Sequence, residues 1–367
     1  MSQISTSSDR ILSIDVFRGL TMFLLIGEFT HLFSFITDES LEETFIYAIG
    51  QQFHHHPWDG LRFWDLIQPY FMFIVGLSLP FAVRSRERKD ESPRNILVHV
   101  LKRSTILLLL GWALYCIDPG RIVFRFQNVL SQIAFTYLIA FLIMNRSFTF
   151  QIFFSIGLLA LTEMIYRFFP IEGFNHPFTP NENFGTWLDL QYGGADLNGS
   201  WVSFNAIPTA AHTIWGVLVG KWLMTEQPNK TKFLWMFGAG ILLIIIGYLL
   251  DPITPIIKRI STSSFVIVSG GWSILALAIL FWMVDIRNLS GKWTWFFQVV
   301  GMNSLFIYLF AHVGGANFIE NIFHPFSFAL FNWGSELTAE ILTSVLVWFA
   351  LWGLCYWMYK KRLFIKI

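Results

Sequence analysis

The sequence predicts an all-α, polytopic membrane protein with about ten transmembrane helices in one bundle. Hydrophobic residues make up 54% of the 367 positions and charged residues only 13%, whereas a soluble globular domain carries roughly 25% charged residues. The charges that remain are clustered. They leave apolar runs of about 18 residues or more, long enough to cross a bilayer core of roughly 30 Å. The alternating ten-residue segments typical of membrane β-strands are absent from the sequence.

Ten apolar segments are long enough to be spans, and we treat residues 1–367 as a single membrane-embedded domain. The predicted spans are residues 12–36, 60–83, 97–117, 126–145, 150–169, 204–224, 232–250, 262–285, 294–312 and 337–359. The stretch 312–336 contains His312, Glu320 and His324, and it is left open as a short re-entrant segment.

The distribution of basic residues predicts the orientation. If the N-terminus is cytoplasmic, the connections on that side hold most of the 25 Lys and Arg residues, including those of "RSRERKDESPRN" (84–95) and the tail "KKRLFIKI". The opposite face then carries the acidic stretch "TDESLEE" (37–43) and the connection 170–200. The positive-inside rule therefore predicts that both termini are cytoplasmic, as in a protein of the plasma (inner) membrane.

Several classes of function find no support in the composition. The two cysteines, Cys116 and Cys355, lie in apolar segments predicted to be helical, so neither a disulfide framework nor a thiolate metal site is indicated. The net charge of +1 gives no indication of a nucleic-acid partner, and we expect none. The N-terminus lacks a basic region followed by an apolar run and a cleavage site, so we expect the first span to be retained.

The stretch "FHHHPWDG" (53–60) places three histidines at the outer mouth of the second span. Neighbouring side chains do not converge on one ion, and no HExxH or CxxC completes a ligand set, so no metal is predicted. Histidine titrates near neutral pH, so one of the three could act as a general base or nucleophile. The alternative is ordinary loop polarity. Pro57 favours a helix start close to that residue, which leaves the histidines in the incoming loop.

Charged residues inside the predicted spans are functional candidates, because a charge in the bilayer is costly. Asp15 and Arg18 are three residues apart, so they share a helix face and can pair. Glu28 stands deeper in the first span and needs a partner, a wet cavity or a proton. Asp65 precedes Pro69 in the second span, where a mid-helix proline frees a carbonyl group.

Motifs along nearly the whole chain resemble one known family. The first span reads "RILSIDVFRGLTM", and the second begins "HHPWDGLRFWDLIQPYFMFIVGLSLPF". Further matches are "RFQNVLSQIAFTYLIA" (125–140), "WLDLQYGG", "DLNG" (196–199), "IPTAAHTIWGVLVG", "KRISTSSFVIVSGG" (258–271) and "GMNSLFIYL" (301–309). In this order, the set resembles the heparan-α-glucosaminide N-acetyltransferase family and its bacterial relatives.

The resemblance implies acetyl transfer from cytosolic acetyl-CoA to the amine of a terminal glucosamine, or a related amino sugar, on the outer side. The family's active histidine stands three residues before the tryptophan of this motif. The tryptophan is Trp58 here, so the corresponding histidine is His55. Asp59 or Glu28 could orient its imidazole. The residues expected to hold the donor are Asp15, Arg18, Asp65, Arg125, Asn303 and Ser304. Asn303 and Ser304 have the alternative role of bonding between helices, and Arg84 and Arg86 are further candidates for the CoA phosphates. Animal relatives suggest a homodimer.

The sequence departs from the family pattern at three positions. Phe29 stands where the animal enzymes have an asparagine, Gln132 replaces the arginine of "VLQR", and Leu190 replaces the arginine of "IDR". These positions fall where an acceptor or a CoA group would be held. Two other hypotheses stay open. One is transfer of another acyl group, or transfer to a hydroxyl of an envelope glycan. The other is a proton-coupled transporter that uses Asp15, Glu28 and Asp65.

Overall fold

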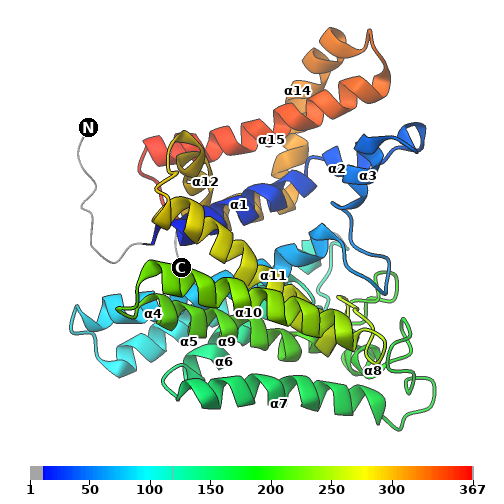
Figure 1. Cartoon of the computed structure of the whole chain (residues 1–367). Coiled ribbons are helices and arrows are strands. Elements are labelled where there is room, and N and C mark those ends of the chain that lie inside the picture. Colours follow the sequence, from blue (N-terminus) through cyan, green and yellow to red (C-terminus); the bar gives the residue numbers. More distant parts are fainter. Residues whose placement is uncertain (1–10, 118, 366–367) are drawn as a thin grey trace. The chain divides into compact units, whose positions relative to one another are not determined.

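The computed structural model describes residues 11–117 and 119–365, and the regular secondary structure in these ranges is helical (Figure 1). The described ranges hold no strand beyond one isolated antiparallel bridge, between Asp59 and Ile257. The predicted all-α class is therefore confirmed. The expectation that the first span is retained concerns in part residues 1–10, which lie outside the described residues.

Two compact units make up the described chain. The first holds His56–Leu61 and Gln68–Trp282, and the second holds Ile11–His55, Arg62–Ile67 and the described part of Met283–Ile367. The prediction of a single domain over residues 1–367 stays a prediction.

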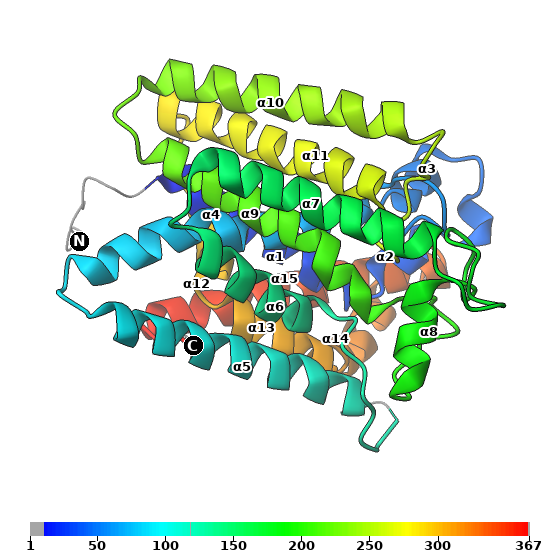
Figure 2. The same ribbon diagram turned by 90° about the horizontal axis from the view of Figure 1, so that it is seen from below.

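The first unit is built around α9 (Ala206–Leu223), whose residues are nearly all buried. Helices α7 and α6 pack on it, α11 contacts it, and α10 lies along α11 (Figure 2). The other helices of this unit are α4 (Ile67–Glu87), α5 (Pro93–Ile117), α6 (Val129–Ile143), α7 (Phe148–Arg167), α8 (Phe184–Gln191), α10 (Asn229–Leu250) and α11 (Ser263–Phe281). The 3₁₀ helix η3 (Ser203–Asn205) leads into α9, and the π-helical turn η4 (Trp282–Ile286) follows α11.

Small residues let α9 approach α4 closely. A Cβ atom on Gly216 would lie 2.2 Å from the Phe73 carbonyl oxygen, and one on Gly220 would lie 2.5 Å from that of Leu77. Reciprocally, a Cβ on Gly76 of α4 would lie 1.9 Å from the Thr213 carbonyl oxygen. Gly216 and Gly220 form the G-x-x-x-G spacing that allows backbone contact between membrane helices.

The second unit is built on α1 (Leu12–Glu28), which packs against α12 (Lys292–Met302). A Cβ on Gly19 would lie 1.9 Å from the Phe297 carbonyl oxygen, so this pair also needs a glycine. The first turn of α1 has no local cap; the Asp285 carboxylate accepts from the Leu12 and Ser13 N–H groups at 2.9 and 3.1 Å. The remaining helices of this unit are α2 (Leu32–Phe35), η1 (Glu39–Leu41), α3 (Phe45–Gln51), η2 (Phe63–Leu66), α13 (Ser304–Phe310), η5 (Ala311–Gly315), α14 (Ala316–Phe331) and α15 (Glu336–Lys360).

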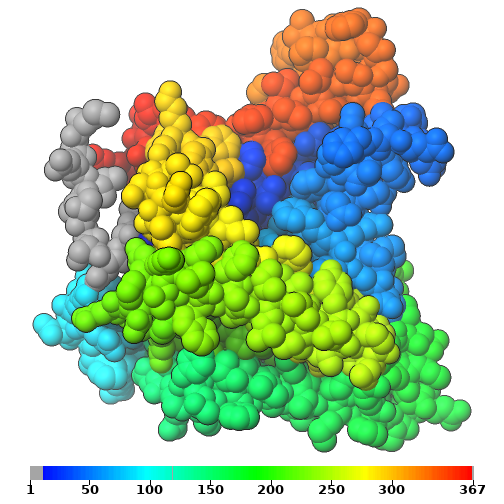
Figure 3. Space-filling model, viewed as in Figure 1, coloured from blue at the N-terminus to red at the C-terminus, as the bar shows by residue number. Residues whose placement is uncertain are grey.

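The stretch that the sequence left open, residues 312–336, is mostly helix. It contains α14, which forms a hairpin with α15, the orange and red segments of Figures 1 and 3. The chain bends by 68° between Lys292–Met302 and Ser304–Phe331. Asn303 stands at the bend with φ −125° and interrupts the helix.

Each of the ten predicted spans contains a helix, but the number of membrane crossings is not confirmed. In the described residues, six helices are long and apolar enough to cross a membrane, and seven if the bent pair counts as one span. They begin with Phe63–Glu87, which joins η2 to α4, and continue with Pro93–Ile117, Phe148–Arg167, Asn229–Leu250, Ser263–Ile286 and Glu336–Lys360. The α10 helix, in the yellow-green band of Figure 3, exposes Leu234, Trp235, Leu242 and Leu249, as expected of a surface in contact with lipid.

Two span boundaries differ from prediction because of local backbone conformation. The first helix ends at Glu28 instead of continuing to residue 36, since His31 takes a left-handed conformation with φ 60°. The second span does not begin at Pro57: residues 56–62 are irregular, and α4 begins at Ile67 after η2. Pro69 therefore lies in the first turn of α4, where a proline breaks no helical hydrogen bond, and not in mid-helix.

Candidate functional site

His55 and Asp65 form the central contact of the candidate site. The Asp65 Oδ1 atom lies 2.9 Å from His55 Nδ1. The Asp65 side chain is 1% exposed and the His55 side chain 31% exposed. Both residues belong to the second unit. A buried carboxylate thus binds one nitrogen of a partly accessible imidazole.

The segment between α3 and η2 is held so that these two side chains meet. Asp65 Oδ2 accepts from the Arg62 backbone N–H at 2.9 Å, which caps η2. The Arg62 guanidinium donates to the His55 carbonyl oxygen at 3.3 Å. The Trp64 N–H donates to the Gln52 carbonyl oxygen at 2.9 Å. These bonds close the loop that carries the histidine onto the helix that carries the carboxylate.

The two neighbouring histidines have different surroundings. His54 Nε2 lies 2.9 Å from Thr37 Oγ1 and 3.0 Å from the Phe33 carbonyl oxygen, so it joins its segment to the α2 region. His56 belongs to the first unit, and its ring lies against Gly60, where a Cβ atom would come within 2.6 Å of Nε2. Gly60 has φ 141°, a conformation that favours glycine. The structure therefore distinguishes His55 from two histidines of similar sequence context, and both neighbours lie in the incoming loop, as predicted.

The His55–Asp65 contact determines which imidazole nitrogen can act as a base. A carboxylate only accepts hydrogen bonds, so the proton of the neutral ring resides on Nδ1. The lone pair is then on Nε2, the arrangement of a histidine that takes a proton from, or attacks, a reacting group. The same carboxylate would stabilise the imidazolium that forms.

Asp65 contacts His55, whereas the sequence suggested Asp59 or Glu28 for orienting it, and these two roles stay predictions. Asp59 has an exposed side chain and lies at the isolated bridge to Ile257. Glu28 is the last residue of α1 and is also exposed. Asp65, predicted to help hold the donor, contacts His55. A ten-residue separation through irregular backbone gives no periodic signal that could have identified this pair.

Asp15 and Arg18 pair as their spacing predicts, with Arg18 Nη1 3.4 Å from Asp15 Oδ1.

Asn303 is fully buried and its amide binds the C-terminal segment: Nδ2 donates to the Leu363 carbonyl oxygen at 3.0 Å, and Oδ1 accepts from the Ile365 N–H at 3.0 Å. Ser304 begins α13. Asn303 therefore bonds to the chain's own tail, a role that neither of its two predicted alternatives included.

A buried chain of amide side chains lies in the first unit, at the position where the sequence departs from the family pattern. Gln132 is fully buried; it accepts from Gln68 and donates to Asn205 and to the Gln127 carbonyl oxygen. Arg125, from the same motif, donates to the Ala195 carbonyl oxygen at 3.3 Å. The neutral amide thus has partners from α4 and from the residue that precedes α9.

Asp189 of α8 is a functional candidate that the sequence analysis did not single out. Its Oδ2 accepts from Gln127 Nε2 and from the Ser203 N–H, both at 2.9 Å, and its Oδ1 accepts from the Tyr192 hydroxyl. Burial raises the pKa of Asp189 above its ordinary value, and the three hydrogen bonds oppose that rise. Leu190, beside it, is 41% exposed. The sequence feature that could have identified Asp189 is its position as the aspartate of the "WLDLQYGG" motif in the 170–200 connection.

The part of the chain that the structure describes contains no group of three or more His, Cys, Asp or Glu side chains placed to hold a metal ion. The histidine cluster accordingly does not form a ligand set there, because His54, His55 and His56 have the separate surroundings described above.

Comparison with known proteins identifies the family. The sequence profile described as "Heparan-alpha-glucosaminide N-acetyltransferase, catalytic" matches residues 10–250. Heparan-alpha-glucosaminide N-acetyltransferase of Mus musculus is 24% identical over 434 aligned positions, which cover 99% of this chain and 61% of the mouse protein. The Homo sapiens protein is 24% identical over 438 positions, covering 100% of this chain and 61% of its own length. The chain thus spans about three fifths of the length of these relatives. With its long apolar helices, it is a multi-pass membrane protein that belongs to the heparan-alpha-glucosaminide N-acetyltransferase catalytic family.

Proposed function

We propose that the protein is a transmembrane acetyltransferase that moves acetyl from cytosolic acetyl-CoA to the amine of an amino sugar on the outer side. The 2.9 Å contact between His55 and Asp65 carries this proposal. Family membership supports the reaction class, because the relatives are named as N-acetyltransferases that act on a heparan glucosaminide. We further propose that the protein works in the plasma (inner) membrane with both termini cytoplasmic, and that it forms a homodimer.

Two routes fit the proposed role of His55. In the direct route, Nε2 takes a proton from the acceptor amine while the nitrogen forms a bond to the thioester carbonyl carbon. The C–S bond then breaks and the CoA thiolate leaves. In the covalent route, Nε2 itself bonds the acetyl carbon and releases the thiolate; the amine then displaces the imidazole, whose freed Nε2 takes the proton that the amine loses. Asp65 stabilises the positive charge on the ring in both routes.

Arg18 is the proposed contact for the CoA phosphates. Its side chain is 32% exposed, and a guanidinium presents five N–H donors in a planar fork that matches the geometry of a phosphate group. Arg18 lies in the second turn of α1, and we propose that this end of the helix faces the cytoplasm. Arg125 and Ser304 remain proposed donor contacts, and Asn303 is proposed to act through the C-terminal segment that it binds.

The test is acetyl transfer by the full chain purified in detergent or nanodiscs, with radiolabelled acetyl-CoA and a panel of amino-sugar and hydroxyl acceptors. We expect acetylated amine from the wild-type protein and none from His55→Ala. His324→Ala is the matched control, because His324 also contacts a carboxylate, with Nε2 3.2 Å from Glu340 Oε1. Full activity of His55→Ala would remove the proposal. Product formed only with hydroxyl acceptors would show that the proposed amine acceptor is wrong. Product formed only with other acyl-CoAs would show that the proposed acetyl donor is wrong.

A further inference from the structure

The segment that follows the histidines is attached to two irregular stretches of the first unit. We call Trp58–Gly60 the WDG segment, residues 251–262 the α10–α11 loop, and residues 168–183 the α7–α8 connection. Trp58 Nε1 donates to the Phe178 carbonyl oxygen at 2.7 Å, and the Gly60 N–H donates to the Ile256 carbonyl oxygen at 2.8 Å. Asp59 lies at the bridge to Ile257. The WDG segment is therefore only as well placed as these two stretches.

One arginine touches both stretches. Arg167, the last residue of α7, donates from Nη2 to the Ile253 carbonyl oxygen at 2.6 Å and to Thr254 Oγ1 at 3.1 Å. Its guanidinium also lies over the Phe178 ring, 4.9 Å from the centroid. Cation–π contacts of this kind stabilise the packing of an aromatic ring. Arg167 thus connects the acceptor of the Trp58 hydrogen bond with the loop that accepts from Gly60.

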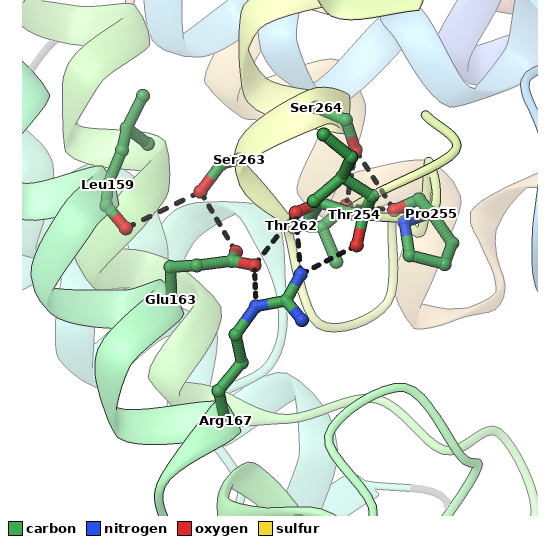
Figure 4. A network of polar contacts seen from close by, with 9 residues as sticks. Leu159, Glu163, Arg167, Thr254, Pro255, Thr262, Ser263 and Ser264 are labelled. Carbon is green, nitrogen blue, oxygen red and sulfur yellow. Dashed lines mark hydrogen bonds and ion pairs between the residues drawn. The ribbon is translucent and has the colours of Figure 1, made fainter. Parts of the chain in front are cut away.

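Glu163 fixes the arginine from one turn earlier in α7 (Figure 4). Its Oε1 accepts from Arg167 Nε at 2.6 Å and from Thr254 Oγ1 at 2.7 Å, and its Oε2 accepts from Ser263 Oγ at 3.3 Å. The Glu163 and Arg167 side chains are 23% and 33% exposed. A pair in this partly exposed setting contributes little as an isolated salt bridge. The pair instead fixes the conformation of the α10–α11 loop, because both side chains form hydrogen bonds to that loop.

We propose that Arg167, held by Glu163, is a positioning residue that orders the WDG segment. By ordering that segment, it restricts the backbone conformation at the nearby His55. His55 precedes His56 by one peptide bond, and the His56 ring is packed on Gly60 of the same segment. Loss of the Arg167 contacts would loosen both the α10–α11 loop, which accepts from Gly60, and the α7–α8 connection, which accepts from Trp58. The inference rests on the proposed function for its effect on catalysis, but not for its effect on the order of the segment.

The experiment compares Arg167→Met with the wild-type full chain in nanodiscs, by amide hydrogen exchange and by acetyl-transfer kinetics. We expect exchange in the peptide that contains Gly60 to be at least about fivefold faster, because its hydrogen-bond acceptor becomes mobile. We expect kcat to fall about tenfold or more, since small displacements of a catalytic group are costly, while KM for acetyl-CoA changes by less than about twofold. Arg121→Met is the matched control, because Arg121 is exposed. This variant is expected to have the wild-type exchange rate at Gly60 and the wild-type kcat and KM.

Wild-type exchange at Gly60 in Arg167→Met overturns the inference, and so does faster exchange with wild-type kcat. If the wild-type protein transfers no acetyl group, the proposed function fails, and exchange at Gly60 alone then decides whether Arg167 orders the segment. Should Arg167→Met not fold, Glu163→Gln replaces it. That variant keeps the arginine and removes the charge that holds it, with the same direction of change expected.

Discussion

Asp65 binds His55 with one carboxylate oxygen and caps its own helix with the other: Oδ1 lies 2.9 Å from His55 Nδ1, and Oδ2 accepts from the Arg62 N–H at 2.9 Å. The same side chain therefore sets both the tautomer of the imidazole and the start of η2. Asp65 is fully buried, so its carboxylate is shielded from bulk solvent.

Replacing Asp65 by asparagine tests the tautomer. The amide can still accept from the Arg62 N–H, so the fold is retained, but its NH₂ group would donate to Nδ1 and move the ring proton to Nε2. We expect kcat for acetyl transfer to fall about a hundredfold or more, by analogy with histidines whose orienting carboxylate is replaced. Kinetics and thermal unfolding of the purified variant provide the measurement.

Asp38→Asn is the control for that substitution. Asp38 also caps a 3₁₀ helix, accepting from the Ser40 N–H at 2.9 Å, but it is exposed. Its replacement should leave kcat unchanged. Equal kcat values for the Asp65→Asn and wild-type proteins would show that the contact with His55 does not set the reactive tautomer.

Gly216→Ala should destabilise the first unit. The new Cβ would lie 2.2 Å from the Phe73 carbonyl oxygen, and this neighbour is backbone that cannot rotate away. Separation of α9 from α4 is expected to cost about 1–3 kcal/mol and to lower the Tm in detergent.

Gly238→Ala on α10 is the matched control, since a Cβ atom added at Gly238 would have nothing within 4 Å. Alanine has a higher helix propensity than glycine, so the Tm of this variant should equal or exceed that of the wild type. A wild-type Tm for Gly216→Ala would mean that α4 and α9 do not require the G-x-x-x-G contact.

The stability of the protein should depend on pH through Asp189. Its pKa is raised in the folded state, mainly by burial, so the folded protein binds the proton more tightly than the unfolded chain does. The contribution is fully present below the ordinary value of 3.8 and is lost as the pH rises through the folded pKa.

The wild-type protein should therefore gain stability relative to Asp189→Asn as the medium becomes more acidic. The difference in Tm, wild type minus variant, is expected to be larger at about pH 4 than at about pH 7. Tm measured at both values in nanodiscs checks the sign. A difference that is constant with pH would show that Asp189 does not titrate differently in the two states.

Hydropathy was enough to predict the helices of the ten spans, but it did not predict α3, α8 or α14. Every predicted span holds a helix, because a run of apolar residues in lipid must satisfy its backbone groups internally. The Asp15–Arg18 pair was predictable for a related reason: residues three apart on a helix are neighbours. The boundaries at residues 36 and 57 were not predicted correctly, since His31 and Gly60 adopt conformations that depend on their surroundings.

The sequence by itself determined the all-α class, the positions of the helices of the ten spans and the family, and its motif register singled out His55 among three adjacent histidines. Only the tertiary structure decided that Asp65 is the carboxylate beside it, and that Asn303 binds the tail. Helix geometry relates residues separated by three or four positions. Contacts that pass through irregular backbone follow instead from the hydrogen bonds and packing that set the path of the loop, and those come from distant parts of the chain.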